Sequence, residues 1–328
     1  ATLCALCANK LLSTEKSKMK TLVIYHKNCA DGMAAAWAAY TYFGDTAEYL
    51  AMNYNDPAVK LENDNLTFPV PLSGRRVFIL DFSFKPDIHS AIVAEAAEVV
   101  WLDHHKTAFE DRGLDPAKAY EQRTGRDVCV LDPSMSGCLI AWNFFHPESA
   151  PPFALRLIDD RDRWVWQYGA DTRNFATALR SKPLTIERIE EAVHAVDRLI
   201  EQGAAMNTLF DQQLDDITRK PVRLELRATS TQDLTGLSWV GLAVNCTPQF
   251  ASEAGNKLAD KSGTFGATWC AGDNGKIFFS LRSIGNYDVS EIARFYGGGG
   301  HKNAAGFNTP FRCLKWHQEL NTYYVEQP

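Results

Sequence analysis

Three short apolar runs near the start of the chain each lead directly into a residue that can bind a metal ion. The runs are residues 21–25 before His26, 77–80 before Asp81, and 99–102 before Asp103, His104 and His105. Apolar runs without alternation are typical of parallel strands that are covered on both faces of a sheet. Because ligands bind beyond the carboxyl ends of such strands, the residues after the three runs are predicted to assemble into one site.

Helices are predicted around these strands, at residues 32–43, 87–97 and 136–145, with Ser136 as the N-cap of the third. The alternation of strands and helices indicates an α/β fold, with an N-terminal open, mainly parallel sheet flanked by helices. A chain of 328 residues exceeds the usual size of a single domain, so two domains are expected.

The pattern changes after residue 180. Apolar residues recur at steps of three and four between 186 and 200, which predicts a connecting helix over 181–220 that ends at Pro221. The preceding residues, 19–180, are then expected to form the first domain.

Residues 221–328 are expected to form a second, smaller α/β domain with a mixed sheet. Three apolar runs in this part predict strands at 239–244, 264–270 and 276–282. The DNG sequence at 273–275 is a strong hairpin signal between the last two runs. Ahead of both domains, residues 1–18 are basic and precede Met19, and we expect them to be an extension or tag outside the fold.

Composition narrows the classes of function. The formal net charge of −6 argues against a broad basic surface for long nucleic acid. No run approaches the roughly 20 apolar residues that a membrane-spanning helix needs. Eight cysteines without a disulfide-like framework favour a reducing compartment. We therefore expect a cytoplasmic protein, or one of an organelle matrix if residues 1–18 are the remnant of a presequence.

Histidines and aspartates at three strand ends suit a pair of divalent cations. Two such cations about 3.5–4 Å apart can clamp a phosphoryl oxygen and lower the pKa of a bridging water. A bridging ligand must be a carboxylate, because it has two oxygens whereas an imidazole presents one lone pair to a metal. Asp81, on the central run, is the predicted bridge.

These residues resemble the motifs of the DHH phosphoesterases. The sequence Asp103-His104-His105 matches the motif that names the family. The other matching segments are 26–32 (HKNCADG), 80–83 (LDFS), 157–162 (LIDDRD) and 297–307 (GGGGHKNAAGF). The last of these is similar to the glycine-rich signature of the DHH-associated C-terminal domain. Together the five segments cover about residues 19–311 in the family's order, which is far more specific than the three-residue motif alone.

The resemblance implies a metal site. Its ligands would be His26, Asp31, Asp81, His104 and Asp160, with Asp159 as the alternative to Asp160. The family usually has an aspartate where this chain has Cys29, so Cys29 is either a softer ligand or a small packing residue. The expected cofactors are two divalent cations, with Mn²⁺ first and Mg²⁺, Zn²⁺, Fe²⁺ or Co²⁺ as alternatives.

The resemblance also implies the groups that handle the substrate. His105 would face the phosphate, and Asp103 would orient the histidines from behind. In the second domain, the substrate would be contacted by Arg282, Gly299, Gly300 and His301.

These expectations lead to a metal-dependent phosphodiesterase that hydrolyses short oligonucleotides (nanoRNA) or dinucleotides by two-metal activation of water. Two alternatives stay open. One is a phosphomonoesterase, pyrophosphatase or polyphosphatase of the same fold. The other is a catalytically silent nucleotide-binding protein in which Cys29 marks a lost metal. The expected partner is a small nucleotide substrate rather than long nucleic acid or a membrane, and the sequence leaves open whether the protein is a homodimer.

Overall fold

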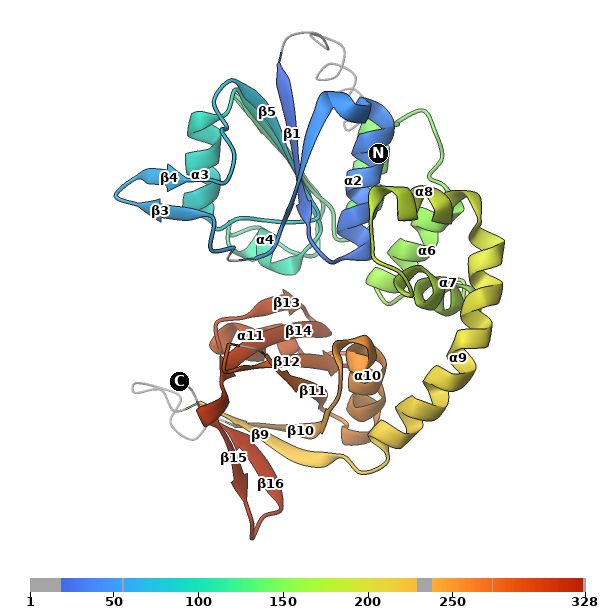
Figure 1. Cartoon of the computed structure of the whole chain (residues 1–328). Helices are drawn as coiled ribbons and strands as arrows, with labels where there is room; N and C mark the ends of the chain where they lie inside the picture. Colours follow the sequence, from blue (N-terminus) through green and yellow to red (C-terminus); the bar gives the residue numbers. More distant parts are fainter. Residues whose placement is uncertain (1–18, 55, 229–237, 273, 327–328) are drawn as a thin grey trace. The chain divides into compact units, whose positions relative to one another are not determined.

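The computed structural model describes residues 19–54, 56–228, 238–272 and 274–326. The predicted extension, residues 1–18, lies outside the described residues. The chain divides into two units, one up to Asn207 and the other from Thr208 (Figure 1). Among the described residues, no helix combines the length and the apolar character needed to cross a membrane.

The first unit contains a six-stranded sheet in the order β2-β1-β5-β6-β8-β7. Every neighbouring pair is parallel except β7 with β8. The strands are β1 (Lys20–His26), β2 (Ala47–Met52), β5 (Arg75–Leu80), β6 (Glu98–Asp103), β7 (Tyr120–Thr124) and β8 (Asp127–Leu131). The three apolar runs are β1, β5 and β6, and these strands are adjacent. The predicted mainly parallel sheet is confirmed, and its carboxyl edge gathers the residues that follow the runs.

Helices cover both faces of this sheet, which explains the continuous apolar runs. Alternate residues of one strand enter different cores: Val23 packs in one core and Leu22 in the other. Figure 1 shows α2 and α3 on opposite sides of β1 and β5. The helices of the unit are α2 (Ala30–Phe43), α3 (Pro86–Glu95), α4 (Lys106–Glu110), α5 (Gly137–Phe145), α6 (Phe153–Asp162), α7 (Ala170–Arg180) and α8 (Ile186–His194). A small hairpin, β3 (Lys60–Glu62) with β4 (Asn65–Thr67), lies outside the main sheet.

The second unit contains an eight-stranded mixed sheet in the order β13-β14-β12-β11-β10-β9-β16-β15. The strands are β9 (Val222–Arg227), β10 (Ser238–Asn245), β11 (Phe265–Ala271), β12 (Lys276–Ser283), β13 (Gly299–His301), β14 (Ala304–Pro310), β15 (Leu314–His317) and β16 (Thr322–Val325). Its helices are α10 (Ala251–Ser262) and α11 (Val289–Phe295). Strands β11 and β12 pair antiparallel, as the hairpin signal predicts, although residue 273 of that turn lies outside the described residues.

The segment predicted as one connecting helix forms two helices, α8 and α9 (Val196–Thr218), which are separated at Ala195. The point where the two units divide lies within α9. On the side of the first unit, α9 packs closely on α7 at Gly203. A Cβ atom on Gly203 would overlap the backbone carbonyl oxygen of Asn174. The same two helices are joined by hydrogen bonds from Thr177 Oγ1 and Asn207 Nδ2, both 2.8 Å long.

Because of this packing, we expect Gly203→Ala to destabilise the fold, which is the opposite of the effect that this change has in an exposed helix. In an exposed helix, changing glycine to alanine stabilises the fold by roughly 1 kcal/mol. Gly203→Ala should instead lower the free energy of unfolding by about 1–3 kcal/mol, because the added methyl group forces α7 and α9 apart. Denaturant unfolding monitored by circular dichroism measures the change. Gln202→Ala, on the exposed side of α9, is the control and should be near neutral. A stabilised Gly203→Ala variant would contradict the close packing.

Candidate metal centre

Asp81 directly follows β5 and has a left-handed backbone conformation, with φ of 54°. This conformation is uncommon for a residue with a Cβ atom and persists only where the surrounding structure enforces it. The Asp81 amide donates a 2.9 Å hydrogen bond to the Leu102 carbonyl, which ties its backbone to β6. The Asp81 side chain is 1% exposed. The strain therefore lies at the residue that the sequence singles out as the bridge.

Two groups of side chains that could hold a metal ion share Asp81. On one side, His104 Nε2 lies 3.1 Å from Asp81 Oδ1, 3.5 Å from Asp31 Oδ2 and 3.6 Å from Asp162 Oδ2. On the other side, His26 Nδ1 lies 3.5 Å from Asp81 Oδ2. Cys29 belongs to this second group, in which ligand atoms of His26, Cys29 and Asp81 lie within 4.8 Å of one another. The two oxygens of Asp81 thus face different sets of donors, as a bridging carboxylate requires.

Several donor atoms of these groups are buried without a hydrogen-bond partner. They are His26 Nδ1, Asp81 Oδ2 and Asp162 Oδ2. A buried polar atom left unsatisfied costs about 1–3 kcal/mol, so three in one place indicate that another group completes the site. Burial, together with the nearby Asp31, raises the pKa of Asp81 and of Asp162. Divalent cations fit this donor set, because they supply the missing partners and offset the crowded negative charge.

Asp31 is held by the start of α5. Its carboxylate accepts hydrogen bonds from the Ser136 hydroxyl at 2.7 Å and from the amides of Gly137 at 2.7 Å and Cys138 at 2.9 Å. Burial alone would raise the pKa of Asp31, but His104 and these hydrogen bonds outweigh it and keep the pKa below its usual value. Ser136 precedes α5 as predicted, yet its side chain makes no capping bond. Asp31 satisfies the first amides of the helix instead.

Two glycines let helices begin in contact with the strand ends. A Cβ atom on Gly137 would lie 2.5 Å from the Cβ atom of Asp81. A Cβ atom on Gly32, in the first turn of α2, would overlap the carbonyl oxygen of His26. Both positions therefore require glycine for close approach, and both bring the positive end of a helix dipole towards the carboxylates.

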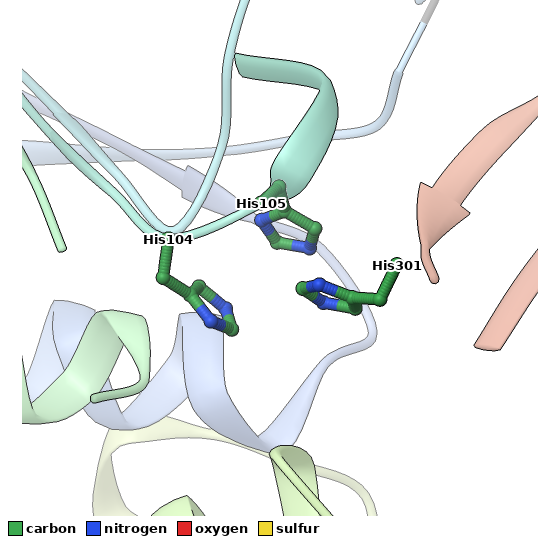
Figure 2. A group of neighbouring side chains, drawn as sticks. All are labelled: His104, His105 and His301. Atoms are coloured by element: carbon green, nitrogen blue, oxygen red, sulfur yellow. The ribbon is translucent and has the colours of Figure 1, made fainter. Parts of the chain in front are cut away.

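Asp103 contacts the backbone of both histidines that follow it and the ring of His105. Its Oδ1 accepts hydrogen bonds from the backbone amides of His104 at 2.7 Å and His105 at 3.2 Å, and it lies 2.8 Å from His105 Nδ1. Burial favours a raised pKa for Asp103, but His105 outweighs it and lowers the pKa to about 2. Figure 2 shows the rings of His104 and His105 side by side, and their centroids lie 4.5 Å apart.

The structure places Asp162, rather than Asp160 or Asp159, beside Asp31 and His104. Asp160 accepts hydrogen bonds from the amides of Gln167 and Tyr168 and from the Thr172 hydroxyl. Asp159 forms a two-point ion pair with Arg163, with distances of 2.7 and 2.8 Å. All three aspartates are in the segment that resembles the fourth motif, so the sequence located the segment but not the residue. The three side chains leave the end of α6 in different directions, and this direction decides which aspartate lies beside His104.

A further residue at the site has no signal in the sequence. The ring of Tyr54, which follows β2, has its centroid 5.3 Å from that of His26 and 5.9 Å from that of His105. Desolvation of the Tyr54 hydroxyl, together with the charges of Asp103 and Asp81, raises its pKa well above the usual value. A lone tyrosine in a loop forms no pattern that sequence analysis can detect.

In the second unit, the predicted substrate residues lie on neighbouring strands. Ala304 of β14 pairs with Arg282 of β12 on one side and with His301 of β13 on the other. Residues directly opposite each other point to the same face of a sheet, so Arg282 and His301 share a face. Arg282 donates a 2.9 Å hydrogen bond to Ser252 Oγ. His301 is the last residue of β13 (Figure 2).

The glycines predicted to contact substrate also have a packing role. Gly299 pairs with Gly306, and Gly300 pairs with Ala305. Gly300 has φ of 139°, and a Cβ atom there would lie 2.5 Å from the Ala304 carbonyl oxygen. Glycine is therefore required at position 300 for the approach of β13 to β14.

The family model of the DHHA1 domain matches residues 239–315, which contain Arg282 and the glycine-rich segment. The chain therefore contains a DHHA1 domain, and this domain together with the five sequence segments supports the DHH superfamily. The match confirms the resemblance of the glycine-rich segment at 297–307, and the other four segments precede the matched residues. The N-terminal DHH motif lies in the unit that carries the metal-binding groups, and the DHHA1 match lies in the other unit.

Two relatives match most of the length of this chain. It is 28% identical over 302 residues to an uncharacterized protein of Acanthamoeba polyphaga mimivirus, and the match covers 87% of this chain and 66% of the viral protein. It is 24% identical over 292 residues to the oligoribonuclease NrnB of Bacillus subtilis (strain 168), covering 86% of this chain and 71% of that protein. The chain thus spans slightly less than two thirds of the viral relative.

Among solved structures, the fold is similar to RecJ in complex with Mn²⁺ from Thermus thermophilus. The TM-score is 0.48 and the sequence identity is 13%. The match covers 93% of this chain and 52% of RecJ.

Paired variants in α6 test the assignment of Asp162. Asp162→Asn should weaken Mn²⁺ binding by more than about tenfold, because it removes a charged donor beside His104. Asp160→Ala should leave Mn²⁺ affinity nearly unchanged but lower stability, because it frees the backbone amides of Gln167 and Tyr168. Titration calorimetry with Mn²⁺ and thermal unfolding separate the two effects. The reverse pattern would assign the metal to Asp160.

The contact between Gly137 and Asp81 gives a second prediction. Gly137→Ala should displace the Asp81 carboxylate and lower Mn²⁺ affinity by about 10–100-fold, the range typical of losing support for a ligand. Asn143→Ala, on the same helix, is the control and should bind Mn²⁺ normally. Unchanged affinity in Gly137→Ala would show that α5 does not position Asp81.

Proposed function

We propose that this protein is a metal-dependent phosphodiesterase that hydrolyses short oligonucleotides or dinucleotides. The observation that carries the proposal is the pair of donor sets that share Asp81, with three buried donor atoms left without partners. The DHHA1 domain, together with the relative named oligoribonuclease, supports hydrolysis of a phosphate ester in a nucleotide substrate.

Each donor set would hold one divalent cation. His26, Cys29 and Asp81 form the first set. Asp31, Asp81, His104 and Asp162 form the second set. Bound cations would act as Lewis acids towards a phosphoryl oxygen and make an attacking water more acidic. We propose Mn²⁺ as the native ion, because histidine and carboxylate donors both suit it, whereas the cysteine also suits Zn²⁺ or Fe²⁺.

His105 would act on the substrate rather than on the cations, and Asp103 would orient it from behind. Asp103 fixes the ring of His105 through Nδ1, so Nε2 is the nitrogen that would meet the phosphate. Asp103 favours the protonated ring and raises the pKa of His105, although burial opposes this. A protonated imidazole in that position would offset negative charge that develops on the phosphate during attack.

The second unit would bind the remainder of the substrate. Arg282 and His301 share a sheet face, where they would contact phosphate oxygens. Gly299 and Gly300 would let backbone amides approach the same group. The net charge of −6 favours a substrate of a few nucleotides over long nucleic acid.

Hydrolysis assays test this proposal. With Mn²⁺, the wild type should cleave a labelled dinucleotide faster than a long oligonucleotide, and EDTA should abolish both reactions. His104→Ala should lower the rate by more than about a hundredfold, because the change removes a donor from one metal set. His194→Ala is the matched control, since His194 is an exposed residue that pairs with Glu190.

Two results would contradict the proposal. Cleavage that persists in EDTA or in His104→Ala would show that the shared donor sets are not the active site. Metal-dependent hydrolysis of phosphomonoesters or pyrophosphate, with no cleavage of dinucleotides, would assign the same site to another class of phosphate substrate.

A further inference from the structure

Tyr54 is an aromatic residue at the edge of the metal centre, and the proposed chemistry does not use it. The chain leaves β2 at Met52, whose carbonyl accepts a 2.9 Å hydrogen bond from the Lys27 amide. This bond joins the loop after β2 to the loop that follows His26. Tyr54 is thereby brought to the carboxyl edge of the sheet, where its ring contacts the rings of both His26 and His105.

The ring of Tyr54 is supported from behind by buried aromatic residues. Its centroid lies 4.8 Å from that of Phe82, which is 1% exposed. Phe82 in turn packs edge-on against Phe84, with centroids 4.8 Å apart. Phe82 directly follows Asp81, so the support of the ring and the shared carboxylate belong to one short segment. Such backing holds an aromatic ring in place before any ligand arrives.

Tyr54 is nevertheless partly exposed, although its hydroxyl is desolvated. The residue is 39% exposed, although the neighbouring Asp81 and His104 are almost fully buried. A partly exposed aromatic residue that packs on the buried ring of Phe82, beside charged groups, would offer a planar apolar surface next to the proposed phosphate site. Nucleotides have the matching chemistry, with a planar base joined through one sugar to a charged phosphate.

We propose that Tyr54 forms a nucleobase subsite, on which the base next to the reacting phosphate stacks. The inference rests on the proposed function, because it takes a nucleotide as the ligand of the metal centre. The recognised group is the aromatic face of the base, so the subsite should accept different bases. It should bind phosphate esters that lack a base more weakly.

The test compares two ligands that differ only in the base. Adenosine 5′-monophosphate and ribose 5-phosphate are titrated against the full chain with Mn²⁺ by calorimetry, and the ratio of their affinities reports the base contribution. Wild type should prefer the nucleotide by roughly 5- to 150-fold, the equivalent of one stacked base. Tyr54→Leu should lower this ratio towards one, whereas Tyr54→Phe should keep it because the ring remains.

Two controls separate stacking from structural damage. Phe153→Leu changes an aromatic residue that is also 39% exposed but packs against Tyr168, and it should preserve the ratio. Mn²⁺ affinity should be unchanged in Tyr54→Leu. The subsite is refuted if Tyr54→Leu keeps the wild-type ratio of nucleotide to ribose 5-phosphate affinity, or weakens the binding of both ligands equally. It is also refuted if Tyr54→Phe lowers this ratio as much as Tyr54→Leu does.

The assay does not need turnover, so it distinguishes the subsite from the proposed function. A protein that cleaves dinucleotides but binds both ligands equally would refute the subsite alone. A protein that prefers the nucleotide through Tyr54 but cleaves no phosphodiester would support the subsite and refute the proposed function.

Discussion

The buried carboxylate of Asp81 is the constraint on which the metal centre depends. It follows a central strand in a left-handed conformation, and its two oxygens face different donor sets. That conformation is maintained because β5 is paired on both sides and the Asp81 amide is bonded to Leu102. Gly137 completes the restraint by allowing α5 to begin against the Asp81 side chain. If Asp81 serves both donor sets, as proposed, this rigidity would keep its two oxygens in place for both cations.

The two helix starts offset part of the negative charge before any cation binds. Asp31 occupies the first turn of α2 and also accepts the first amides of α5. The pKa of Asp31 is lowered, whereas Asp81 and Asp162 have raised pKa values because they are buried beside Asp31. The fold thus supports one carboxylate through helix amides and leaves the other two without such support. This division of support explains why a strongly acidic centre is compatible with a stable sheet.

The second unit uses glycine for packing as well as for the predicted approach of substrate. Gly300 is required where β13 approaches β14, and the same short strand ends in His301. Arg282 is braced by Ser252 and shares a face with His301. Residues that a motif marks for substrate binding are therefore also the residues that keep the strands close. Substitution of a glycine in this segment would affect packing and binding together, whereas His301 offers a cleaner test of binding.

The sequence by itself determined the sheet and the region of the site, because continuous apolar runs are characteristic of doubly covered parallel strands whose ends must meet. It also located the DHH motif and the glycine-rich segment, since both are local patterns. Tertiary structure decided which side chains converge. It directs Asp162 rather than Asp160 towards His104, makes Asp31 rather than Ser136 the cap of α5, and breaks the predicted connecting helix at Ala195. Tyr54 likewise reaches the site only through the tertiary arrangement of the chain. Side-chain direction at the end of a helix or in a loop depends on packing between distant segments, which no local pattern contains.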